Sequence, residues 1–382
     1  MSLLDIWQTN PELLADYRVD QIIAVAGSGK LRDSNDASNE FRQYLAAIDS
    51  DHLCRYASEC LTTRFEDSGL ALQDIVNEIG RRLGFAVTPG VYRGTAGSAN
   101  YDGLWRQDAT HIVVEVKTSD VYTIDLQTPI GYRSTLIQTH EIGPDSSSVL
   151  LVVGRQDTGA LEAQVRGSRH AWDIRLISVD GLAHLLRIKE SVDEPAVAAR
   201  IRDLLRPQEF TKVDAIIDLV FATAEDVRQT DEVPEPGAGR HAPANFHDEC
   251  TTRISRYLGT PLVKQSRVLS TSPDENVAVM CAVSREYDPT TRPSYWYAFH
   301  THYLDALASA PKAYAAFGCG TPDSILLIPL ADFRPWLEGM NTTQLADGFY
   351  WHVSIFRPAN TYTLHRKRGT PRIDLTRYLL PQ

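Results

Sequence analysis

The sequence predicts an α/β fold, a mixed β-sheet flanked by helices, followed by a second domain of the α+β class. Two observations predict it. Between residues 68 and 190 the apolar residues change repeatedly from helical spacing to short continuous runs, so that strands alternate with helices. After a segment at 225–245 that is rich in proline, glycine and charge, the pattern changes to aromatic, strand-like pieces.

The domain organisation follows from length and composition. A chain of 382 residues is longer than a typical single core and suits two domains. No apolar run approaches the roughly 20 residues of a membrane helix, and the start lacks the pattern of a signal peptide. We expect an N-terminal helical extension at 1–65, the α/β domain at 66–224, a linker at 225–245 and the α+β domain at 246–382.

Charge and cysteine content narrow the class of protein. The net charge of −11 argues mildly against a protein that coats nucleic acid, but it leaves room for a local basic groove. The five cysteines show no C-x2-C pair, so a zinc site is not indicated. Their odd number and scatter predict reduced thiols and a cytoplasmic location.

Each element of the α/β domain has its own signal. The segment "SGLALQDIVNEIGRRLG" places its apolar residues on one helical face, with Ser68 as a cap and Gly84 as a stop. The run "SSVLLVVGR" is continuous and apolar, which is typical of a buried strand. The predicted helices are 68–84, 125–140, 158–170 and 180–190, and the predicted strands are 85–94, 100–105, 110–118, 147–155 and 172–179.

One predicted strand carries charges that an apolar strand does not need. In "THIVVEVKT", Glu115 and Lys117 are two residues apart and project on the same face. Buried charges need partners, and Asp102 at the start of the preceding strand can bring a second carboxylate. Two carboxylates and several waters suit Mg²⁺ or Mn²⁺, with a substrate phosphate completing the coordination. Lys117 would then orient or help deprotonate the attacking water, or offset the transition-state charge, and Glu78 on the preceding helix would be an additional ligand.

This arrangement resembles the PD-(D/E)xK phosphodiesterase superfamily, which has the restriction-endonuclease-like fold. The resemblance covers about 66–190. Asp102, Glu115 and Lys117 match the motif residues, Glu78 matches the helix glutamate of many members, and "WDIRLISVDGLAHLLR" is similar to the closing strand and helix of the Mrr-type branch. The resemblance implies a Mg²⁺-dependent DNA endonuclease of restriction or anti-phage defence type.

The sequence also departs from the family pattern. Tyr101 stands where the motif has proline. Several branches place a glutamine close behind the lysine, and here the nearest is Gln127. We therefore keep Gln127 and Tyr132 as additional candidates.

Two basic segments are candidates for nucleic-acid contact. In "QVRGSRHAWDIR", Arg166 and Arg169 would contact phosphate or belong to a solvated helix end. The densest basic run, at 362–378, would follow a nucleic-acid backbone or form a basic edge strand that resists aggregation. From that run we select Arg366, Lys367 and Arg368.

The segment "YWYAFHTHY" at 295–303 carries five aromatic residues and two histidines. A packed aromatic core is favoured over a metal site, because no supporting ligand spacing accompanies the histidines. A base or small ligand stacked on Trp296 or Trp351 is the intermediate alternative.

We thus expect a DNA endonuclease that acts as a homodimer, with RNA or branched DNA as alternative substrates. The C-terminal domain would recognise DNA or a trigger ligand. A different class stays open: a nucleic-acid or ligand-binding sensor protein on a nuclease-like scaffold without cleavage activity.

Overall fold

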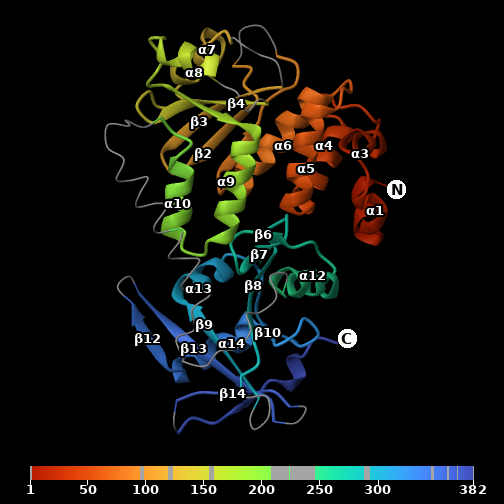
Figure 1. Cartoon of the computed structure of the whole chain (residues 1–382), viewed down its shortest axis with the longest axis vertical. Helices are drawn as coiled ribbons and strands as arrows, with labels where there is room; N and C mark the ends of the chain where they lie inside the picture. The colour runs from red at the N-terminus through yellow and green to blue at the C-terminus, as the bar shows by residue number, and fades with distance from the viewer. Residues whose placement is uncertain are drawn as a thin grey trace. The chain divides into compact units, whose positions relative to one another are not determined.

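The computed structural model describes residues 2–94, 99–118, 124–154, 159–207, 223, 246–287, 293–345, 348–358, 361–367 and 369–381. The chain divides into two compact units, Met1–Glu232 and Val233–Gln382 (Figure 1). Both contain mixed sheets and helices, so the predicted fold class is confirmed. The segment predicted as a linker, 225–245, lies outside the described residues.

The first unit is built on a five-stranded sheet in the order β1-β2-β3-β4-β5. Neighbouring strands are antiparallel from β1 to β3 and parallel from β3 to β5, so the sheet is mixed. The strands are β1 Ala86–Pro89, β2 Gly103–Gln107, β3 Thr110–Lys117, β4 Ser147–Val153 and β5 Ile174–Ser178.

Helices cover both faces of this sheet. Ile112, Val114 and Val116 of β3 pack in one cluster with α6 and α9, whereas Val113 packs in another with α7 and α8. This is the two-sided burial that a parallel core needs. The helices are α6 Ser68–Arg82, α7 Gln127–Gln138, α8 Gly159–Arg166, α9 Val179–Ser191 and α10 Pro195–Asp203.

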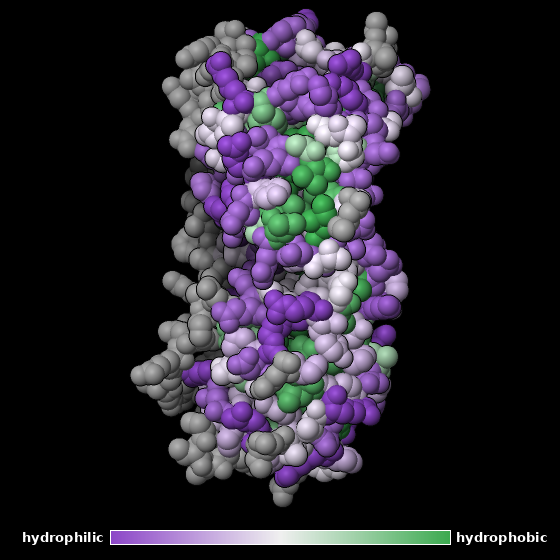
Figure 2. Space-filling view, turned by 90° about the vertical axis from the view of Figure 1, so that its right-hand side faces the viewer, coloured by the Kyte–Doolittle hydropathy of each residue, from purple (hydrophilic) through white to green (hydrophobic). Residues whose placement is uncertain are grey.

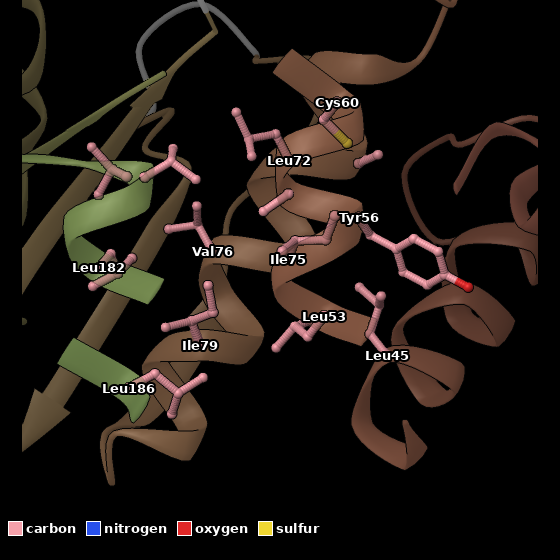
Figure 3. Packing of buried hydrophobic residues seen from close by; sticks show 14 of the residues in the cluster. Leu45, Leu53, Tyr56, Cys60, Leu72, Ile75, Val76, Ile79, Leu182 and Leu186 are labelled. Carbon is pink, nitrogen blue, oxygen red and sulfur yellow. The ribbon is translucent and has the colours of Figure 1, made fainter. Parts of the chain in front are cut away.

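Helix α6 is the centre of the helical layer. Its Leu72, Ile75, Val76 and Ile79 lie between α5 and α9, with Leu53 and Tyr56 on one side and Leu182 and Leu186 on the other (Figure 3). The helices of 1–65 therefore share one core with the sheet domain. They are α1 Leu3–Thr9, α2 Pro11–Ala15, α3 Val19–Val25, α4 Asp36–Ala47 and α5 Ser50–Thr62.

The second unit packs two sheets against each other. Phe317 of one sheet contacts Tyr297 of the other, with ring centroids 4.9 Å apart, and both belong to one buried cluster. The first sheet has the order β11-β10-β8-β7-β6, and in the second β13 joins β9, β12 and β14. The strands are β6 Val263–Lys264, β7 Leu269–Thr271, β8 Val277–Ser284, β9 Ser294–His300, β10 Lys312–Cys319, β11 Ile325–Pro329, β12 Thr342–Leu345, β13 Gly348–Phe356, β14 Thr363–His365 and β15 Ile373–Asp374.

Helices of this unit pack against its sheets. Helix α12, Phe246–Leu258, covers the other face of the first sheet through Phe246, Cys250 and Ile254. The remaining helices are α13 Thr301–Ala308 and α14 Leu330–Phe333, with 3-10 turns at Arg334–Gly339 and Thr376–Tyr378. In the described parts of the chain, no helix has the length and apolar character to span a membrane. Figure 2 shows one face of the molecule, on which hydrophilic residues predominate and apolar groups form smaller patches.

Candidate active site

The register of β2 and β3 brings the two predicted acids together. Gly103 pairs with Val114 and Leu104 with Val113, so one further step places Asp102 opposite Glu115. Opposite residues of an antiparallel pair share a face. That face is the one on which Leu104 and Val113 pack beneath α7 and α8.

The side chain of Asp102 continues the strand ladder where β2 begins. Its main-chain N–H donates to Val114 O at 3.1 Å, and its Oδ2 accepts from the Val116 N–H at 2.7 Å. The carboxylate thereby takes the place of a main-chain carbonyl. This bond fixes the carboxylate above the backbone of β3, directly beside Glu115.

Two side chains of α6 hold the main chain of Asp102. Gln73 Nε2 and Asn77 Nδ2 donate to Asp102 O at 3.1 and 2.8 Å, and Asn77 Oδ1 accepts from Trp105 Nε1 at 3.0 Å. A Cβ on Gly103 would lie 2.1 Å from Asn77 Oδ1, so this approach requires glycine. Gln73 and Asn77 were not among the residues predicted from the sequence. Their signal is a pair of polar residues four apart on a helix face that is otherwise apolar.

Glu115 and Lys117 form a close ion pair. Lys117 Nζ donates to Glu115 Oε1 at 2.5 Å, and Glu115 is only 5 % exposed. The second oxygen, Glu115 Oε2, is buried and has no hydrogen-bond partner among the described residues. A buried carboxylate oxygen without a partner is costly, and a cation or water would satisfy it.

The site carries an excess of negative charge. Burial, and then the charge of Glu115, raise the pKa of Asp102 to about 7. Burial works against the ammonium of Lys117, but its bond to Glu115 and the charge of that carboxylate raise its pKa above the ordinary value. Lys117 therefore stays protonated. One ammonium does not balance two buried carboxylates, which favours a bound cation.

Tyr132 of α7 lies beside this pair. Burial raises the pKa of its phenol, and the charge of Glu115 raises it further, while Lys117 acts in the opposite direction. The phenol is thus neutral at physiological pH and can donate a hydrogen bond. Tyr132 packs against the cluster of Leu104 and Val113, which neighbour Asp102 and Glu115 on the same face of the sheet.

The donor atoms of the acidic pair are carboxylate oxygens of Asp102 and Glu115. One of them, Glu115 Oε2, has no hydrogen-bond partner within the described ranges. Over the described ranges, no three side chains of His, Cys, Asp or Glu are placed to hold a metal ion. Two carboxylates with the remaining positions left to water and substrate fit Mg²⁺ or Mn²⁺.

Glu78, which the sequence predicts as an additional metal ligand, is instead bound by two arginines. Its two oxygens accept from Arg82 Nε at 3.2 Å and Arg81 Nη1 at 3.1 Å, and Arg82 reaches the carbonyls of Leu45 and Ile48. Successive helical residues point about 100° apart, so Glu78 faces α4 when Asn77 faces the sheet. The carboxylate is thus neutralised by arginines and is not grouped with Asp102 and Glu115.

Gln127 and Arg169 lie together. Arg169 Nη2 donates to Gln127 Oε1 at 3.3 Å, and Gln127 Nε2 lies 3.2 Å from His170 Nε2. Arg166 is exposed and pairs with Glu162 at 4.0 Å. Helix α8 ends at Arg166, four residues before the predicted end, because a turn through Gly167 follows.

The basic run of the second unit is partly structural. Arg366 is half-buried against Gly339, and its Nη2 donates to Pro371 O at 2.9 Å. Lys367 is exposed, and Arg368 lies outside the described residues.

The two tryptophans considered for stacking have different surroundings. Trp296 is half-buried and meets Tyr350 and His352 edge to face, with ring centroids 6.1 and 5.5 Å apart. Trp351 packs against Phe299 and Phe349. The structure therefore places Trp351 beside the aromatic core.

Comparison with known proteins identifies no family for this chain. No family model matches the chain, and no curated protein matches it either. Among solved structures, the chain is similar to the small subunit (R.BspD6I2) of the heterodimeric restriction endonuclease R.BspD6I. The identity is 11 % and the TM-score 0.29, over 46 % of this chain and 98 % of that chain. A restriction endonuclease subunit is therefore a weak structural neighbour, and the likeness establishes no activity.

Proposed function

We propose that this chain is a Mg²⁺- or Mn²⁺-dependent endonuclease that hydrolyses phosphodiester bonds of DNA. The observation that carries the proposal is the buried Oε2 of Glu115, which has no hydrogen-bond partner in the described part of the chain and lies beside Asp102, whose pKa is raised to about 7. Two carboxylates that repel each other in a buried site are a costly arrangement unless they bind a cation.

Asp102 and Glu115 would hold the metal ion. When bound, the ion supplies a more acidic water and screens the charge that builds on the phosphate. The chain's own contribution is to fix the two carboxylates. Asp102 is fixed by the Val116 N–H and by α6, and Glu115 is fixed by Lys117.

Lys117 and Tyr132 have roles that follow from their protonation. The raised pKa of Lys117 keeps it as a cation, which stabilises negative charge on a phosphate and positions a water. The phenol of Tyr132, neutral because its pKa is raised, would donate a hydrogen bond to the substrate at the same place. Neither group serves as the resting general base.

A metal-dependent cleavage assay tests the proposal. Plasmid, linear, methylated and single-stranded DNA are incubated with Mg²⁺, with Mn²⁺ or with EDTA. We expect cleavage by the wild-type chain only with metal, and loss of cleavage in Glu115→Gln. Cleavage in EDTA, or a wild-type rate in Glu115→Gln, would contradict the proposal. A metal-induced rise in melting temperature that Glu115→Gln lacks is a readout independent of activity.

The assembly and biological setting are further parts of this proposal. Cutting both strands takes two active sites, and a two-fold homodimer is the simplest source. A solution mass that stays monomeric while double-strand breaks form would contradict the dimer. We also propose a role in restriction or anti-phage defence, with the second unit recognising DNA or a trigger ligand.

A further inference from the structure

The loop between α8 and β5, residues 167–173, presents an exposed aromatic side chain. Trp172 is 70 % exposed, the highest value among the large hydrophobic side chains in the part of the chain that the structure describes. Arg169, three residues before it, is exposed as well. An exposed aromatic side chain and an exposed cationic side chain on one loop are the two kinds of group that bind single-stranded nucleic acid, through stacking and phosphate contact.

The loop is held in place by a chain of polar contacts. Arg169 Nε donates to His170 Nε2 at 3.1 Å, and His170 Nδ1 lies 3.5 Å from Asp173 Oδ2. Asp173 Oδ1 accepts in turn from Arg133 Nη1 at 3.1 Å. A loop fixed in this way loses little conformational entropy when it binds.

Helix α7 connects this loop to the acidic pair. Gln127 opens the helix and bonds to Arg169, and Tyr132, five residues on, packs against the cluster that includes Val113, which precedes Glu115 on the same face of β3. Five residues of helix rise about 7.5 Å. At about 3.4 Å per base along one strand of B-DNA, this is roughly two base steps.

We propose that the loop 167–173 binds the nucleic-acid strand that is cut at the acidic pair, with Arg169 on a phosphate and Trp172 stacked on an unpaired base. This inference rests on the proposed function and specifies its substrate. Paired bases show no open face to a side chain except at an end. The preferred substrate is therefore DNA with unpaired bases near the cut: a single strand, a bulge or a frayed end.

Binding of labelled DNA to the full-length chain tests the inference. The probes are fluorescein-labelled oligonucleotides of one sequence, as a single strand and as a blunt duplex, measured by anisotropy in EDTA. We expect Trp172→Ala to weaken single-strand binding roughly 5- to 150-fold and Trp172→Phe to restore most of it, because stacking needs a ring. The duplex should be affected less. Arg169→Gln should reduce the salt slope for the single strand by about 0.7.

Leu13 provides the control, because it is an exposed apolar side chain, 52 % exposed, on α2 of the first unit. Leu13→Ala should bind both probes as the wild type does. All variants should keep the wild-type melting temperature, since exposed side chains contribute little to stability.

Three results would overturn the inference. The first is wild-type affinity of Trp172→Ala for the single strand, and the second is no binding of either probe by the wild type. The third is a Trp172→Ala variant that differs from the wild type only in its solution mass. The last would make the loop a contact between copies of the chain. Failure of the proposed function is seen separately, because the cleavage rate of Glu115→Gln decides it. DNA binding that depends on Trp172, without metal-dependent cleavage, would support this binding surface and contradict the proposed nuclease activity.

Discussion

Asn77 connects Asp102 to the hydrophobic core: its Nδ2 donates to Asp102 O at 2.8 Å while its Oδ1 accepts from the buried Trp105 indole at 3.0 Å. Asn77 is 1 % exposed. The position of the candidate metal ligand is therefore fixed through a helix that contributes no carboxylate to the site.

This contact predicts an effect of Asn77 on metal binding. Asn77→Ala should destabilise the fold by about 1–3 kcal/mol, because the Trp105 N–H loses its acceptor, and should weaken Mg²⁺ or Mn²⁺ binding. Gln73→Leu is the milder comparison, since it removes one bond to the same carbonyl. Thermal shift with increasing metal measures both. A normal metal affinity in both variants would show that α6 does not position Asp102.

Removing one negative charge should separate stability from function. Asp102→Asn should abolish cleavage and the metal-induced thermal shift. Without metal at pH 8, its melting temperature should equal or exceed that of the wild type, because the repulsion from Glu115 is gone. A large loss of metal-free stability would instead mean that the Asp102 charge is needed for folding.

The raised pKa of Asp102 predicts how metal affinity depends on pH. Its pKa is about 7 in the folded chain and 3.8 ordinarily, so the folded state binds the extra proton between these values. The contribution of Asp102 to the stability of the metal-free chain is fully present below pH 3.8 and is lost as pH rises through about 7. Metal must displace the proton, so its affinity should rise with pH up to about 7 and then level off. Titrations of metal at several pH values that give one constant affinity would contradict this.

Lys117 should affect turnover more than metal binding. Lys117→Met keeps much of the side-chain volume and removes the cation, so cleavage should slow while the thermal shift with Mg²⁺ persists. Loss of the ammonium leaves Glu115 Oε1 without its partner, and a bound metal ion compensates for this. A variant that cleaves at the wild-type rate would exclude Lys117 from the chemistry.

Glu78 should matter for folding and not for metal. Arg82 is 2 % exposed, so Glu78→Ala leaves a buried cation without its carboxylate, which typically costs about 3–5 kcal/mol. Chemical denaturation measures the loss. Metal affinity of the folded fraction should stay normal. A selective loss of metal binding in Glu78→Gln would restore Glu78 as a ligand.

The sequence by itself determined the order of helices and strands in the first unit and the strand that carries Glu115 and Lys117. These features are local. The 3.6-residue period, the two-residue period and continuous apolar runs can be read from neighbouring residues. They do not depend on how the elements pack. The same local rule placed Glu115 and Lys117 on one face of β3.

Only the tertiary structure decided which polar side chains of α6 face the sheet. Asn77 and Glu78 are adjacent and both are buried, so the hydrophobic pattern cannot tell which one meets Asp102. That choice depends on how the helix rotates between α5, α9 and the sheet, and on Gly103, which admits Asn77 at close range. The bond between Gln127 and Arg169 is likewise a long-range contact. It follows from the path of α7 across the sheet, because side chains distant in sequence meet only once the layers are packed.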